Sequence, residues 1–165
     1  NRYRISQPAN EDQEGTRIFL NIDEDSDFCE RLCCSTNRSL TLYVHAGATR
    51  DGPILQSMHK PFHLQGCCFC RPKVEVYAGP RAATPIGYVE DPFKCCAMDQ
   101  QVYDGERSLL LTTKGSICQL GLLCPCCFSV DFDILRNGSK VGRVSKRPLT
   151  FCEFVQKTNR FLVDF

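Results

Sequence analysis

Thiol side chains crowd one short stretch of the sequence, where Cys67, Cys68 and Cys70 fall within four positions. A strand-like alternation of polar and apolar residues follows at once over residues 73–77. Thiols this close together can carry acyl groups, bind a metal or be oxidised. The structural alternative is a buried cysteine-rich corner, because a free cysteine packs like a small hydrophobic residue. The residues alone leave these alternatives open.

Two Cys-x-x-Cys pairs favour the metal alternative. Cys67 with Cys70, and Cys124 with Cys127, have the spacing that tetrahedral zinc prefers. The two pairs are far apart in the sequence, so a shared zinc site requires two strand ends to meet in space. An acyl group and a zinc ion would compete for Cys67 and Cys70, and the two interpretations exclude each other there.

An acidic run over residues 23–27 begins like the calcium-binding loop of an EF-hand. The similarity ends at the sixth position, where Phe28 replaces the glycine, and at the twelfth, where Cys34 replaces the glutamate. We therefore expect a solvated acidic loop.

A basic stretch over residues 140–147 carries four cations and no acid. The cations are Lys140, Arg143, Lys146 and Arg147. Such a strand can bind phosphate or an acidic groove, or it can be the charged outer face of a sheet. The residues favour neither over the other.

Signals for catalysis are weak in this sequence. His45, His59 and His63 stand beside no nucleophile or carboxylate motif, and no phosphate loop or dinucleotide-binding fingerprint is present. The sequence therefore assigns no chemical reaction.

The composition is that of an ordinary globular chain, apart from the cysteines. Of 165 residues, 42% are hydrophobic, and the formal net charge of +1 gives no global attraction to nucleic acid or an anionic membrane. The 13 cysteines are odd in number and include adjacent pairs, which favours reduced, cytoplasm-facing thiols over a disulfide framework. No apolar run approaches the ~20 residues that span a bilayer. We expect one domain over residues 1–165 that does not cross a membrane.

Strand signals dominate the chain. Strands are expected over residues 17–22, 40–45, 54–59, 62–64, 73–77, 85–90, 101–103, 108–113, 130–135, 140–144 and 161–163. Asp104-Gly105 and Asn137-Gly138 predict hairpin turns. The single expected helix covers residues 149–158. Many short strands at regular spacing predict an all-β sandwich or barrel.

An ordered series of motifs resembles the phospholipid scramblase family over the whole chain. The series is Cys29-Glu30-Arg31-Leu32-Cys33-Cys34, Cys67-Cys68-x-Cys70, Pro85-Ile86-Gly87-Tyr88-Val89, Cys124-x-Cys126-Cys127-x-x-Val130-Asp131-Phe132 and Val141-Gly142-Arg143-Val144-Ser145-Lys146. Each motif alone is unspecific, whereas their order is specific. The resemblance implies the tubby-like fold, an antiparallel β-barrel closed around a hydrophobic C-terminal helix.

The resemblance also implies a function and a location. It implies calcium-linked movement of phospholipids in both directions between membrane leaflets, by a protein held at the inner leaflet through palmitoylated cysteines. In this sequence those cysteines are Cys67, Cys68 and Cys70, and multiple acyl chains would anchor firmly. The stretch 140–147 matches the family's nuclear-import segment. The implied location is the cytoplasmic face of the plasma membrane or of an organelle membrane, with a nuclear role in some members.

This chain departs from the family pattern at both ends and in the proposed calcium segment. A proline-rich tail and a first strand do not precede Asn1, and the hydrophobic helix does not follow Phe165, so the domain is expected to be trimmed at both ends. The calcium segment corresponds to residues 153–165, where Lys157 and Arg160 would repel the ion. Calcium is therefore expected from the family, but its ligands are largely missing here.

The prediction is a scramblase-like protein that translocates lipid without catalysing a chemical reaction. Its expected partners are the phospholipid membrane, a nuclear-import receptor and further copies of the chain, and nucleic acid is not expected. The alternative is an interaction module at the membrane or in the nucleus. Such a module would bind partners or act in transcription, would move no lipid and could be stabilised by zinc.

Overall fold

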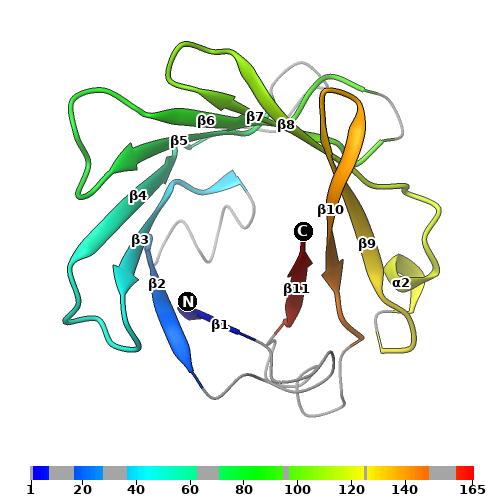
Figure 1. Cartoon of the computed structure of the whole chain (residues 1–165), viewed down its shortest axis with the longest axis horizontal. Helices are drawn as coiled ribbons and strands as arrows, with labels where there is room; N and C mark the ends of the chain where they lie inside the picture. The colour runs from blue at the N-terminus through cyan, green and yellow to red at the C-terminus, as the bar shows by residue number, and fades with distance from the viewer. Residues whose placement is uncertain are drawn as a thin grey trace. The chain divides into compact units, whose positions relative to one another are not determined.

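A computed structural model describes residues 2–7, 17–27, 37–62, 71–94, 97–124, 126–148 and 159–165. The chain divides into two compact units. Unit 1 comprises Asn1–Glu90 and Asp104–Arg107, and unit 2 comprises Asp91–Tyr103 and Ser108–Phe165. Almost all regular structure is antiparallel β-sheet (Figure 1), so the predicted all-β antiparallel fold class is confirmed. The assignment of one domain to residues 1–165 stays a prediction.

Unit 1 is an antiparallel meander in which each strand pairs with the next along the chain. Its strands are β1 (Arg2–Ser6), β2 (Ile18–Asp25), β3 (Leu40–Ala46), β4 (Ile54–Lys60), β5 (Lys73–Ala78) and β6 (Gly87–Glu90). The register places Ser57 opposite both Tyr43 and Tyr77, so these side chains share one face of the sheet. Val44 lies on the other face, and both Val44 and Tyr77 are 5% exposed.

Unit 2 is also a meander, with one short helix inserted. Its elements are β7 (Gln100–Asp104), β8 (Leu109–Lys114), α2 (Leu120–Leu123), β9 (Val130–Arg136), β10 (Ser139–Lys146) and β11 (Phe161–Asp164). Each of these strands pairs antiparallel with the next. Val130 and Ile134 of β9 are buried and lie on the same face, because they are four residues apart in a strand.

The predicted Asn-Gly turn between β9 and β10 is confirmed. Asn137 has φ of 51° and Gly138 has φ of 82°, the positive values that a tight turn of this kind needs at both central positions. A bulge follows between Lys140 and Gly142, where the register with β9 shifts. The bulge decides which β10 side chains share a face.

Three features differ from the sequence-based expectations. The acidic run was expected in a loop, but β2 continues through Asp25, because cross-strand pairing with β3 extends the strand beyond its apolar part. Strand β1 and helix α2 were not predicted, and α2 is too short to give a helical periodicity. Phe62 was expected to begin a strand and does not. The helix expected over residues 149–158 lies outside the described residues.

Candidate functional site

Two of the four predicted basic residues meet at one carboxylate. In unit 2, Lys140 Nζ lies 2.5 Å from Asp133 Oδ1, and Arg143 Nε lies 3.5 Å from the same oxygen. An odd and an even position of one strand would normally point to opposite faces. The bulge at Val141 removes this difference, so both cations lie on the face that carries Asp133 and Leu135.

Asp133 also has a cation opposite it on the neighbouring strand β8. Lys114, at the end of β8, is its register partner there. The hydrogen bond from Lys140, followed by the charges of Lys140 and Arg143, lowers the pKa of Asp133 below its ordinary value. Asp133 is therefore fully ionised at neutral pH, and it partly neutralises the positive charge of this face.

Lys146 and Arg147 lie at the other end of β10. Lys146 is half-buried and stands between Val130 of β9 and Phe161 of β11 in the register. The Arg147 backbone N–H donates to the Arg160 carbonyl oxygen at 3.0 Å. The predicted basic patch is thus two separate pairs of cations, because the strand spreads them along its length.

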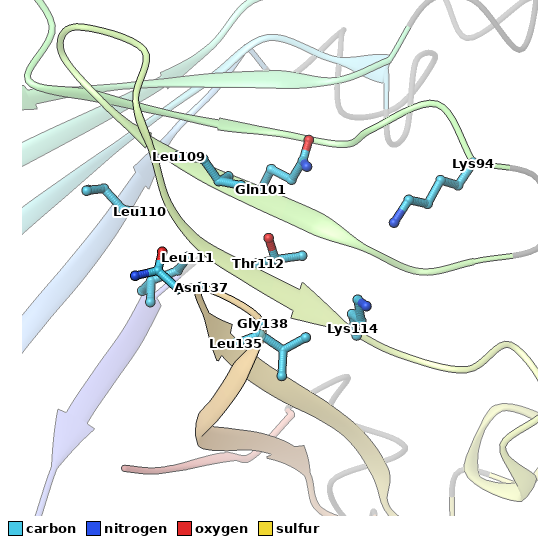
Figure 2. A pocket seen from close by; sticks show the side chains of 10 residues that line it. All are labelled: Lys94, Gln101, Leu109, Leu110, Leu111, Thr112, Lys114, Leu135, Asn137 and Gly138. Carbon is cyan, nitrogen blue, oxygen red and sulfur yellow. The ribbon is translucent and has the colours of Figure 1, made fainter.

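A shallow pocket of about 200 Å³ opens on unit 2 (Figure 2). It is lined by Lys94, Gln101, Leu109, Leu110, Leu111, Thr112, Lys114, Leu135, Asn137 and Gly138. Figure 2 shows Lys94 and Lys114 towards one end and Leu110 at the other. Leu135 stands opposite Lys140 and Thr112 in the register, so the pocket adjoins the cations of β10.

The pocket combines an apolar lining with cations at one end. This arrangement suits part of an amphiphile with an anionic group, but the volume is below that of a typical ligand site. Lys94 is engaged by Asp99, with 2.6 Å between Nζ and Oδ2. The pocket could not be predicted from the sequence, since the leucines of β8 gave only a strand signal and no local pattern indicated which lysines would join them.

The cysteines predicted to carry acyl groups, Cys67, Cys68 and Cys70, lie outside the described residues. Of the zinc alternative, Cys124 and Cys127 are described. Their Sγ atoms are 2.7 Å apart, joined by a thiol–thiol hydrogen bond, and a turn closes the pair, with the Cys127 N–H donating to the Cys124 carbonyl at 3.1 Å. Both thiols are free, as are those of Cys118 and Cys126.

The environment of Cys127 disfavours its thiolate. The hydrogen bond with Cys124 raises the pKa of Cys127, and burial and the two neighbouring thiols act in the same direction. In the described part of the chain, no group of three or more His, Cys, Asp or Glu side chains could hold a metal ion. The two described thiols thus supply half of a tetrahedral site, and zinc stays a prediction that depends on Cys67 and Cys70.

The acidic run is held by arginines of unit 1. Asp23 Oδ2 lies 2.5 Å from Arg50 Nε, and Glu24 Oε1 lies 2.7 Å from Arg38 Nη2. The Ser26 hydroxyl also donates to Glu24, at 3.0 Å. These contacts pair the carboxylates with side chains of the same unit. The run also lacks the glycine and the glutamate of an EF-hand loop, so its role is structural.

Within the described residues, no helix has both the length and the apolarity that crossing a membrane requires.

The family model described as Scramblase matches residues 1–165. Phospholipid scramblase 1 of Rattus norvegicus is 28% identical over 151 residues, which cover 89% of this chain and 41% of the relative. Phospholipid scramblase 2 of Bos taurus is 28% identical over 150 residues, covering 88% of this chain and 46% of the relative. Phospholipid scramblase 1 of Homo sapiens is 30% identical over 136 residues, covering 80% of this chain and 40% of the relative.

The chain spans less than half the length of these relatives. No solved structure gives a significant match.

Proposed function

Because the chain belongs to the scramblase family, we propose that the protein moves phospholipids in both directions between the leaflets of a membrane. The observation that carries this proposal is the family match over residues 1–165, together with relatives named phospholipid scramblases. Because the chain covers less than half of those relatives, lipid movement is stated as a proposal for this protein.

We propose that this chain contributes contact with the bilayer. A headgroup crossing the hydrocarbon needs a polar path, because an unpaired polar group there is very unfavourable. The features of unit 2 that support a contact role are surface features, namely the cations Lys114, Lys140 and Arg143 and the apolar pocket beside them. Lysine and arginine near a membrane surface attract anionic lipids.

Acyl chains on Cys67, Cys68 and Cys70 are proposed as the anchor at the cytoplasmic face. The support is the clustering of three thiols, since several acyl chains hold a protein where one does not. Intact mass of protein from its native host tests this. We expect adducts that survive denaturation and are removed by hydroxylamine. A mass lost on denaturation alone would instead indicate zinc, and would remove the acyl anchor.

The calcium link is proposed from family membership alone. Lys157 and Arg160 would repel the ion, so residues 153–165 are not proposed as its site. Comparing lipid movement in calcium with that in a chelator measures the link directly.

Lipid movement is tested in vesicles that contain the full-length protein and a fluorescent phospholipid in both leaflets. Dithionite bleaches only the outer leaflet, so scrambling raises the bleached fraction from about half towards completeness. The triple variant Cys67→Ser, Cys68→Ser, Cys70→Ser serves as the anchoring control and is expected to reduce protein on the vesicles. Bleaching that stays at half with and without calcium would overturn the transport proposal and leave the interaction module.

The basic stretch is proposed as a second site, for a nuclear-import receptor. The observation that favours it is exposure, because the Lys140 and Arg143 side chains are 44% and 51% exposed. However, β10 pairs with β9 and β11, so a receptor would contact side chains and not an extended free peptide. We expect the double variant Lys140→Ala, Arg143→Ala to lower the nuclear fraction of the protein in cells. An unchanged fraction would remove this site.

A further inference from the structure

Helix α2 of unit 2 exposes its large apolar side chains to solvent and buries a glycine. Its buried residue is Gly121, whereas Leu120 is 60% exposed and Leu123 is 86% exposed. A Cβ on Gly121 would collide with the Ser129 carbonyl, so the helix backbone lies directly against the segment that leads into β9 (Figure 1). Glycine thus allows a close approach that leaves the leucines pointing outward.

The helix is held in this position by a side-chain clamp. The Gln119 amide nitrogen donates to the Asp131 carbonyl at 2.8 Å and to the Ser116 carbonyl at 3.1 Å, and the Asp131 N–H donates to the Gln119 amide oxygen at 2.7 Å. At the other end, the Cys124 N–H donates to the Leu120 carbonyl at 2.8 Å. These hydrogen bonds hold the backbone of the helix in the position that leaves Leu120 and Leu123 exposed.

More apolar side chains of the same short stretch are exposed. Ile117, Leu122 and Phe128 are also exposed, and the sequence contains no charged residue from 117 to 128. We name residues 117–124 and 126–128 the apolar lobe. An apolar cluster of this kind marks a surface that another apolar phase covers.

Cations flank the apolar lobe. It begins three residues after the exposed Lys114 at the end of β8, and Lys146 at the end of β10 stands opposite Val130, where the lobe leads into β9. Arg147 and Arg160 lie beside Lys146. The described acids here are Asp131, Asp133, which stands opposite Lys114 and pairs with Lys140 and Arg143, and Asp99, which is paired with Lys94. The edge therefore carries an excess of positive charge.

We propose that the apolar lobe inserts into the interface of a bilayer that contains anionic phospholipid, with Lys114 and Lys146 at the level of the headgroups. An uncharged apolar projection within a cationic surround matches such an interface, where apolar side chains enter the acyl boundary and cations meet anionic lipid. This inference rests on the proposed membrane partner, and it names a surface that does not include the cysteines proposed to be acylated.

Tryptophan fluorescence tests the insertion. The 165-residue chain contains no Trp, so Leu123→Trp introduces a single reporter at the most exposed position of the lobe. We expect a blue shift on adding vesicles of phosphatidylcholine with about 30% phosphatidylserine, and quenching when the acyl chains are brominated. The matched control is Leu55→Trp on β4, where the native leucine is 51% exposed, and it is expected to show neither change.

Two results would overturn the proposal. Emission from Trp at position 123 that stays unshifted while the protein floats with the vesicles would mean that another surface binds. Emission that is already blue-shifted without vesicles would mean that a second copy or another part of the protein covers the lobe.

A polar substitution gives an independent readout. Leu123→Gln is expected to lower vesicle binding in flotation by about tenfold, the effect of losing one buried leucine, whereas Leu123→Met should retain it. Equal binding of both variants would contradict the proposal. The insertion and the transport proposals can fail separately. If the protein scrambles lipid but the tryptophan at position 123 is not quenched, only the insertion proposal is refuted. If the tryptophan is quenched but the protein moves no lipid, only the transport proposal is refuted.

Discussion

Asp133 controls the charge of one face of unit 2. It holds Lys140 and Arg143 at 2.5 and 3.5 Å and stands opposite Lys114. Because its pKa is lowered, it keeps its negative charge throughout the physiological range, and it would be neutralised only in acid below its ordinary pKa. At the scale of single residues, one carboxylate thus limits how strongly three cations attract an anion.

Replacing Asp133 should therefore strengthen binding to anionic membranes. Asp133→Asn removes one negative charge, and a charge near the surface contributes about 1 kcal/mol. We expect about fivefold tighter binding to phosphatidylserine-containing vesicles at neutral pH, measured by flotation. Asp104→Asn, in unit 1, is the control and should change little. Weaker binding of Asp133→Asn would show that Asp133 mainly positions the cations.

The paired thiols give a second prediction for single residues. Since the hydrogen bond with Cys124 is the largest cause of the raised pKa of Cys127, Cys124→Ala should lower that pKa. More thiolate would then be present at a given pH, and Cys127 should react faster with iodoacetamide near pH 8. Peptide mass spectrometry across a pH series measures the rate, with Cys118→Ala as the control. A rate profile for Cys127 that does not move would contradict the hydrogen bond.

At the scale of elements, two glycines of unit 2 allow neighbouring elements to approach closely. Gly121 seats α2 against the lead into β9, and Gly142 lets β11 lie close to β10, where a Cβ would collide with the Asp164 carbonyl. Neither glycine is needed for a positive φ, since the positive-φ glycines described are Gly47, Gly79 and Gly138. The missing side chain is what matters at these two positions.

Gly142→Ala should therefore destabilise the pairing of β10 with β11. The added methyl group must displace the β11 backbone, and overpacking of this kind costs about 1–3 kcal/mol. Urea unfolding measures the loss, and faster amide exchange in β11 would locate it. Ser139→Ala, at an exposed position of the same strand, should change the free energy of unfolding by less than about 0.5 kcal/mol. Equal stability of the two variants would refute the close approach.

At the scale of the whole molecule, charge is local. The formal net charge is only +1, because 20 lysines and arginines are nearly balanced by 19 acids. In unit 1, Asp23 and Glu24 form ion pairs with arginines. The edge of unit 2 that carries the apolar lobe has more cations than acids. Binding to a membrane should accordingly combine a salt-sensitive part and an apolar part.

Salt should weaken vesicle binding without abolishing it. Raising the ionic strength from about 0.1 M to about 1 M shortens the screening length from about 10 Å to about 3 Å, which suppresses attraction between exposed cations and lipid. We expect wild-type protein to lose most of its preference for anionic vesicles while retaining residual binding. In Leu123→Gln the residual binding should be lost as well. Complete release of the wild type by salt would argue against an apolar contribution.

Much of the fold could be predicted because its signals are local. Alternation of apolar residues indicated nearly all strands, and Asn137-Gly138 indicated the β9–β10 turn, since both depend on neighbours in the sequence. The candidate site could be predicted only in part. The basic stretch was found, but the pocket and α2 were not, because no local pattern indicates which leucines remain exposed after folding.

The sequence by itself determined the antiparallel β class and, through the order of its motifs, membership of the scramblase family. Only the tertiary structure decided which charges meet. One extra residue at the β10 bulge brings Lys140 and Arg143 to Asp133, and one glycine turns the leucines of α2 outward. The physical reason is that strand periodicity acts over a few residues, whereas register, bulges and close backbone approach are set by hydrogen bonds and packing between distant segments.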